Sequence, residues 1–244
     1  MTLVQAEQIA ETKRPKRAAL SVLLRGDPAF LSAWVERMSA GRLALCLGVI
    51  LAGAGSFGAA VGMWRSPMQA VYVAAKLPSI LLLTTLGNAL LNAMLAPLLG
   101  LNLGLRQSLL AILMSFTIEA AILGSLSPLV AFLVWNMPPM SSVLELSGGP
   151  YRCLLLANVG AIAFAGITAN LRLIQLLRQL SGNAAVARRV LLAWLAGNLF
   201  LGAQLSWVFR PFIGAPSLPV EFLRANPLHG NFYETVFHAL RDLL

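Results

Sequence analysis

Five stretches of apolar residues, each long enough to cross a bilayer, constrain this chain more than any other feature. A helix needs about 20 predominantly apolar residues to span the hydrocarbon core. Only 11% of the 244 residues are charged, against about 25% in soluble domains, so a soluble fold could not cover this much apolar surface. The sequence therefore predicts an all-α membrane protein, a five-helix transmembrane bundle over residues 43–209. The predicted spans are Leu43–Trp64, Leu77–Leu101, Gln107–Trp135, Cys153–Leu177 and Val190–Phe209.

The segments that flank the bundle differ from it in composition. Residues 1–28 are polar and basic, which predicts a loosely ordered cytoplasmic tail. In residues 29–42, Phe30, Trp34 and Met38 recur at helical spacing, which is typical of an amphipathic helix lying in the membrane interface. Residues 210–244 are rich in proline, glycine and aromatic residues, so we expect a short irregular C-terminal cap that ends in a helix beginning at Asn231. Within the third span, Ser127-Pro128 predicts a kink or break.

The Lys and Arg residues predict the orientation, because cytoplasmic segments carry the excess of these residues. With the N-terminus inside, twelve of the eighteen lie in cytoplasmic segments and six lie outside. The cytoplasmic set is Lys13, Arg14, Lys16, Arg17, Arg25, Arg37, Arg42, Arg106, Arg172, Arg178, Arg188 and Arg189; the outer set is Arg65, Lys76, Arg152, Arg210, Arg224 and Arg241. This bias predicts an inside N-terminus and an outside C-terminus. The same distribution leaves no continuous basic face, so we expect no nucleic acid as a partner.

Small residues at helical spacing predict close helix packing in two spans. Gly58 and Gly62 lie four residues apart in the first span, and the fourth span has an alanine at every fourth position. Those alanines are Ala157, Ala161, Ala165 and Ala169. Helices in lipid associate through such close backbone contact. The contact is either within one protomer or with a second copy or another membrane protein.

Glu119, near the middle of the third span, is the residue that is most costly to place in lipid. An intramembrane carboxylate normally faces the bundle interior and pairs or takes up a proton. The amides expected nearest to it in depth are Asn88, Asn92 and Asn158, and the first two share one helix face. Either Glu119 hydrogen-bonds an asparagine and joins two helices, or these residues form an ion- or proton-binding site on a permeation route.

The C-terminal cap is the best candidate for a recognition surface, because its aromatic residues give it an apolar side. The predicted docking residues are Trp207, Arg210, Phe212, Phe222, Phe232 and Tyr233. His229, Glu234 and His238 are too few to predict a metal site. The spans contain no His-Glu-x-x-His pattern, Ser-Lys dyad or paired aspartates. We therefore expect no catalytic residues, and the sequence assigns no cofactor.

Several motifs resemble known membrane proteins. The Asp27-Pro28 lead-in, Leu77-Pro78, the turn from Leu99 to Gln107, and Ser127-Pro128 resemble the Yip family of five-span proteins. That resemblance implies five spans, a cytoplasmic N-terminus and a non-enzymatic role in membrane organisation or complex assembly. The stretch from Gln204 to Gly214, with Asn231 to Glu234, resembles the closing motif of uncharacterised bacterial membrane proteins of similar length, which implies the bacterial inner membrane.

Two functions remain open. The first is a non-enzymatic accessory or structural subunit that contacts membrane lipids and docks on other membrane proteins or self-associates. The second is a small channel or carrier for an ion, proton or solute that uses Glu119 and the Asn88/Asn92 face. A stoichiometric protein partner would favour the first, and a polar route reaching Glu119 would favour the second.

Overall fold

The structure is a computed structural model that describes residues 16–25, 34–35, 39–139, 149–214 and 219–234. Throughout this described part, the long regular elements are helices, and five of them are long and apolar enough to cross a membrane. The predicted all-α five-helix bundle is therefore confirmed. The helices are α2 (Lys16–Arg25), α4 (Ala40–Met63), α5 (Pro67–Leu98), α6 (Leu105–Trp135), α7 (Gly149–Ser181) and α8 (Ala184–Val208).

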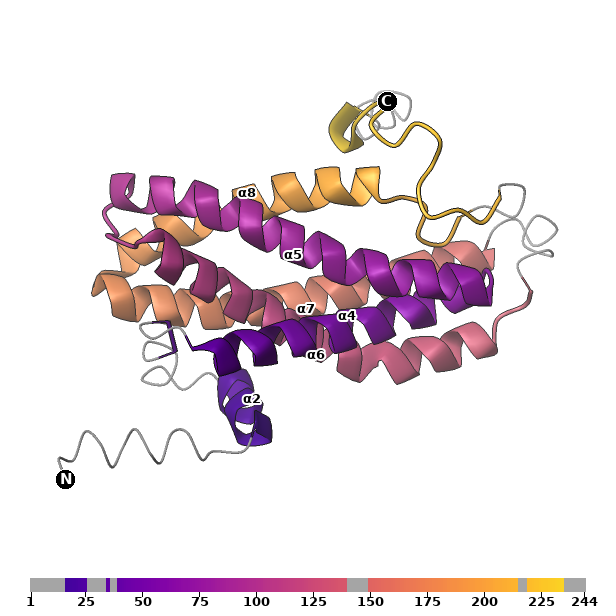
Figure 1. Cartoon of the computed structure of the whole chain (residues 1–244), viewed down its shortest axis with the longest axis horizontal. Helices are drawn as coiled ribbons and strands as arrows, with labels where there is room; N and C mark the ends of the chain where they lie inside the picture. Colours follow the sequence, from indigo (N-terminus) through magenta and orange to yellow (C-terminus); the bar gives the residue numbers. More distant parts are fainter. Residues whose placement is uncertain (1–15, 26–33, 36–38, 140–148, 215–218, 235–244) are drawn as a thin grey trace.

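The five long helices run up and down along one axis (Figure 1). One end of the bundle, the tail end, holds the α4–α5 turn, the end of α6 and the segment 209–234 that follows α8. The opposite end, the arginine end, holds the starts of α4, α6 and α8 (Figure 1). The most apolar part of α6 is 61% buried against 17% for α8, so α6 is the central helix and α8 lies at the periphery.

Local signals in the sequence explain where the helices begin and end. Ser39, Ser66 and Asn183 are N-caps whose side-chain oxygens accept hydrogen bonds from backbone N–H groups in the first turn. Gly100 and Gly182 have φ of +91° and +61° where α5 and α7 end, a conformation that glycine adopts without steric cost. These caps set the short connections that hold neighbouring helices antiparallel.

The helices differ from the sequence prediction in several places. Helix α5 begins ten residues before the predicted Leu77, because Ser66-Pro67 forms a strong helix start, so Lys76 lies inside a helix rather than in an outer loop. The segment 1–28, predicted to be loosely ordered, contains α2, whose Leu23 is fully buried in the core. Helix α6 continues without a break through Pro128.

The predicted interfacial helix 29–42 lies mostly outside the described residues. In its described part, Trp34 and Val35 are helical and almost fully buried in the main core. Arg42 lies 5.1 Å from the centroid of the Trp34 ring and donates to the Trp34 carbonyl oxygen at 3.3 Å. Trp34 therefore packs against the bundle. The predicted C-terminal helix is described only to Glu234, whose N–H donates to Asn231 Oδ1 at 2.8 Å as an N-cap bond.

Candidate docking surface at the tail end of the bundle

The C-terminal segment is fastened to α5 by two buried polar side chains. Lys76 is fully buried, and its ammonium donates a hydrogen bond to the Pro211 carbonyl oxygen at 2.6 Å. Gln69 is 1% exposed, and its amide donates to the carbonyl oxygens of Pro211 at 3.1 Å and Phe212 at 2.6 Å. A buried cation is costly unless it is hydrogen-bonded. The tail carbonyls meet that need and so fix the path of the tail.

Aromatic rings surround the Lys76 ammonium. It lies 5.9 Å from the Phe212 centroid and 5.2 Å from the Phe222 centroid, within range of cation–π attraction. Phe222 also packs edge-on against Tyr72 and Phe209, with centroids 5.5 and 6.5 Å apart. Phe212 and Phe222, which were predicted as docking residues, therefore contact the ammonium that holds the tail on α5, and Phe222 remains 38% exposed.

Ile213, an apolar tail residue that was not among the predicted docking residues, anchors the tail in the core. Ile213 is 6% exposed and packs in a cluster with Phe57 of α4, Trp64 at the C-cap of α4, Val130 of α6 and Leu154 of α7. The tail thus closes the tail end of the bundle. Ile213 lies in the short sequence Pro211-Phe212-Ile213-Gly214, which is too short to show a helical or strand periodicity from which burial could be predicted.

The remaining predicted docking residues form a second group beside α8. The Arg210 guanidinium lies 3.3 Å from the Trp207 ring centroid, and both side chains donate to the His229 carbonyl oxygen. Desolvation, and then the charge of Arg224, lower the pKa of Arg210. The exposed Tyr233 stacks on Phe200 of α8 at 5.8 Å.

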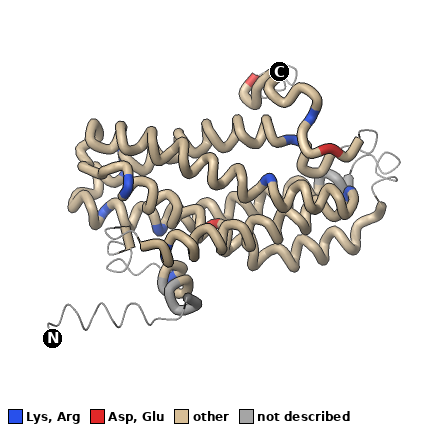
Figure 2. The backbone as a smooth tube through the Cα atoms, in the orientation of Figure 1, with Lys and Arg blue, Asp and Glu red and all other residues tan. Residues whose placement is uncertain are grey.

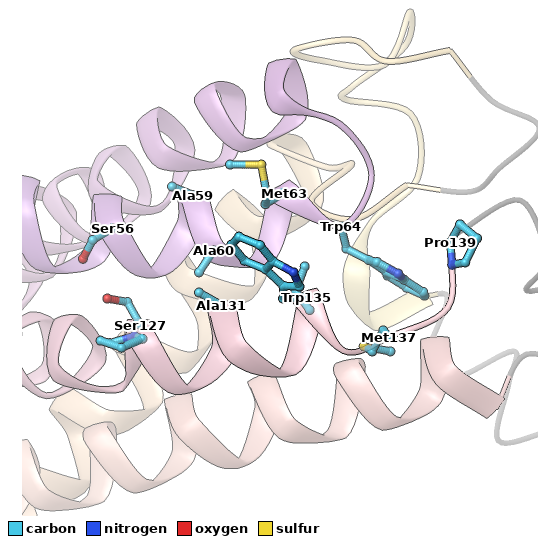
Figure 3. A pocket seen from close by; sticks show the side chains of 12 residues that line it. Ser56, Ala59, Ala60, Met63, Trp64, Ser127, Ala131, Trp135, Met137 and Pro139 are labelled. Atoms are coloured by element: carbon cyan, nitrogen blue, oxygen red, sulfur yellow. The ribbon is translucent and has the colours of Figure 1, made fainter.

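Beside this tail, an open groove of about 650 Å³ lies between α4 and α6 (Figure 3). Its walls are small side chains at matching spacing, Ser56 and Ala60 on α4 and Ser127 and Ala131 on α6. Both serine hydroxyls donate to carbonyl oxygens of their own helices, at 3.0 and 2.8 Å, so the walls are effectively apolar. Met63, Trp64, Trp135, Met137 and Pro139 line its outer part.

The groove is held at both ends by fixed contacts. At its inner end α4 and α6 touch backbone to backbone, since a Cβ on Gly124 would lie 2.8 Å from Gly53 Cα. At its outer end the Trp64 indole N–H donates to the Pro138 carbonyl oxygen at 3.1 Å. From Gly53 to Trp64 is eleven residues, about 16 Å of helix. The groove is therefore preformed and about three helical turns long.

The predicted packing residues lie between helices of the same chain. A Cβ on Gly58 would lie 2.5 Å from the Val73 carbonyl oxygen, and one on Gly62 would lie 2.6 Å from the Gln69 carbonyl oxygen, so both glycines face α5. Along α7, Ala165 and Ala169 are fully buried, whereas Ala157 and Ala161 are half-buried. The close pair Gly53 and Gly124 was not predicted, because neither belongs to a four-residue glycine repeat.

Within the predicted polar cluster, the α5 residues Asn88 and Asn92 do not lie at the depth of Glu119. The Ser108 hydroxyl of α6 donates to the Ala89 carbonyl oxygen of α5 at 3.3 Å, which sets the relative depth of these antiparallel helices. Glu119 lies eleven residues beyond Ser108, so it is about 15 Å from the depth of Asn88 and further from Asn92. Figure 2 shows an acidic position, in red, near the middle of the bundle.

Asn88 instead hydrogen-bonds α8, whereas Asn92 and Asn158 have no hydrogen-bond partner within the described part of the chain. The Asn88 amide donates to Asn198 Oδ1 and to the Trp194 carbonyl oxygen. Asn92 and Asn158 are buried without hydrogen-bond partners in the structure, as is the Thr84 hydroxyl. Three or more His, Cys, Asp or Glu residues that could hold a metal ion do not occur together in the described segments, and His238 lies outside them.

Comparison of the chain with protein-family models, with curated proteins and with solved structures finds no match. The resemblance to the Yip family and to bacterial five-span proteins therefore stays a prediction.

Proposed function

We propose that this chain is a non-enzymatic membrane protein that docks on a transmembrane helix of another protein, or of a second copy, through the groove between α4 and α6. The observation that carries the proposal is the pair of small-residue walls in that groove. Ser56 and Ala60 on α4, like Ser127 and Ala131 on α6, are spaced four residues apart. This spacing lets a third helix approach the backbone closely, which is how helices associate in lipid.

Exposure at the rim supports a protein occupant. Trp135 is 90% exposed and Met63 is 51% exposed beside the groove. Aromatic and methionine side chains are enriched at protein interfaces, and a preformed groove reduces the ordering cost of binding. The tail, fixed by Lys76 and Gln69, extends the same end of the molecule with the exposed Phe232 and Tyr233.

The proposal includes an orientation, with the N-terminus in the cytoplasm and the tail on the outer face of a bacterial inner membrane. Figure 2 shows basic residues at both ends, and the described residues of the arginine end include no Asp or Glu. The positive-inside rule counts Lys and Arg, and the larger number of these residues at the arginine end supports a cytoplasmic location for that end. A periplasmic reporter enzyme fused after Leu244 should be active, and a silent reporter with an active cytoplasmic one would reverse the orientation.

Docking is tested by placing a photo-crosslinking amino acid at Ala131, in the groove, or at Ala163, exposed on α7. We expect one protein adduct of defined mass from position 131 and none from position 163. Ala59→Phe, which fills the groove from the other wall, should abolish that adduct. Adducts with lipid alone at both positions would contradict the proposal, and the adduct mass separates a second copy from another protein.

A second candidate is a carrier or channel that uses the polar face of α5. Its support is that Thr84 and Asn92 are buried with side-chain atoms that have no partner in the structure, a costly arrangement that water or a polar solute would relieve. Proteoliposomes should then show solute or ion flux that Asn92→Leu abolishes. Flux that is lost on Glu119→Gln but kept in Asn92→Leu would place the route elsewhere.

A further inference from the structure

We propose that a groove between the adjoining ends of α7 and α8 binds the headgroup of an anionic phospholipid. This groove, the lipid groove, has a volume of about 380 Å³. It lies at the arginine end, away from the groove between α4 and α6. Its lining residues are Ile174, Arg178, Ala184, Ala185, Arg188 and Leu191.

The polarity of the lining changes with depth along the two helices. Helix α7 ends at Ser181 and α8 begins at Ala184, so Arg178 and Arg188 lie about one turn from the connection. Ile174 and Leu191 lie further along the helices, towards the middle of the bundle. Four residues of helix span about 6 Å. Cationic groups at headgroup depth above apolar side chains match a lipid phosphate with its acyl chains beneath.

The two arginines need an anion from outside the described structure. Both are exposed and line the same groove, where their like charges repel each other. The described acids are Glu119 within the bundle and Glu221 and Glu234 in the tail, so the described residues supply no carboxylate at this end. Guanidinium groups match the geometry of a phosphate, which can accept two parallel hydrogen bonds from each.

The start of α8 contributes charge but few free donors. The Asn183 side-chain oxygen already accepts hydrogen bonds from the N–H groups of Ala185 at 2.8 Å and Val186 at 3.4 Å. The helix dipole still favours an anion here. The arginine side chains, rather than the backbone, therefore provide the hydrogen bonds to the phosphate. Basic clefts between transmembrane helices are the usual sites for anionic headgroups.

The number of charges at this end favours a lipid over a free anion. Besides the two arginines of the groove, six described arginines lie in the helices at this end, namely Arg17, Arg25, Arg42, Arg106, Arg172 and Arg189. Such a face attracts a negatively charged bilayer surface. The apolar floor of the groove then gives the acyl chain of the bound lipid a surface that a free phosphate cannot use.

The proposal is tested on the full-length protein in mild detergent with added phosphatidylglycerol, phosphatidylcholine or inorganic phosphate. Native mass spectrometry measures which of these stays bound, and thermal unfolding measures the change in stability. We expect retained phosphatidylglycerol and a raised unfolding temperature, with neither effect from phosphatidylcholine or inorganic phosphate. The double variant Arg178→Gln/Arg188→Gln should weaken phosphatidylglycerol binding by about tenfold or more. Arg189→Gln, an exposed neighbour that does not line the groove, should change binding by less than about twofold.

Three results would overturn the proposal. The first is equal stabilisation by inorganic phosphate, which would assign the groove to a free anion. The second is the same loss in Arg189→Gln as in the double variant, which would show a diffuse surface charge effect. The third is equal retention of both lipids by the unmodified protein. Because the third comparison uses the native chain, it decides the matter even if the double variant fails to fold.

Discussion

Adding one methyl group at Gly58 should separate α4 from α5. A Cβ at this position would lie 2.5 Å from the Val73 carbonyl oxygen, whereas ordinary contact begins at 3.4 Å. The helices must therefore part by about 0.9 Å at this point, and a gap of that size removes roughly a quarter to a half of the dispersion energy of each interfacial contact. We expect Gly58→Ala to destabilise the bundle by about 2 kcal/mol, roughly thirtyfold in the unfolding equilibrium.

The matched control is Gly48→Ala on the same helix. No atom lies within 4 Å of a Cβ built at Gly48, so the same methyl group should be neutral or slightly stabilising there, by up to about 1 kcal/mol. Both variants are compared by unfolding in mixed micelles of mild detergent and dodecyl sulfate, followed by tryptophan fluorescence. Equal stability of the two variants would refute the argument, because helix propensity alone would then explain Gly58.

Three further changes test other contacts. Lys76→Met removes a charge-assisted hydrogen bond worth about 1.5–3 kcal/mol, so the tail should detach from α5. A reporter cysteine, Ile213→Cys in a Cys46→Ala/Cys153→Ala background, should then react faster with an aqueous maleimide than it does with Lys76 present. Arg224→Met is the control variant, and an unchanged reaction rate in Lys76→Met would contradict the role of Lys76. A double-mutant cycle of Asn88→Ala and Asn198→Ala should give a coupling energy of about 0.6–1.7 kcal/mol, and additive effects would exclude the contact. Gly100 has a φ of +91°, so Gly100→Ala should lower the free energy of unfolding by about 1–2 kcal/mol in the same assay. Gly104 has a φ of −70° and open space around it, so Gly104→Ala should lower the free energy of unfolding by less. Equal destabilisation by the two variants would show that the backbone conformation of Gly100 does not matter.

The five spans could be predicted because span length depends only on local composition. The start of α5 could not be predicted in this way, because hydropathy treats Lys76 as a residue that ends a span. The compensating partner is the carbonyl oxygen of Pro211, 135 residues further along the chain. Ser66-Pro67 was a local signal for the true start. A cap signal of this kind outweighs one charge when a distant segment can solvate that charge.

The candidate site was predicted by residue type better than by geometry. Aromatic composition selected the tail, but Phe212 and Phe222 lie near Lys76, and of the predicted docking residues only Phe222, Phe232 and Tyr233 are exposed. The depth of the polar residues was also predicted poorly, because Glu119 and Asn88 each lie well inside a span. The hydrogen bond between Ser108 and Ala89 fixes the register of the two helices, and in that register Glu119 and Asn88 differ in depth by about 15 Å. Depth within a span cannot be compared between helices until their ends are known.

The groove between α4 and α6 depends on contacts that no single span reveals. Gly53 and Gly124 bring the two backbones together at one end, and Trp64 reaches the Pro138 carbonyl oxygen at the other. Between these two contacts, Ser56 and Ala60 of α4 face small residues of α6, and these small side chains do not fill the space between the two helices. The proposed lipid groove, by contrast, depends only on α7, α8 and their short connection. Substitutions in one groove should therefore leave binding at the other unchanged.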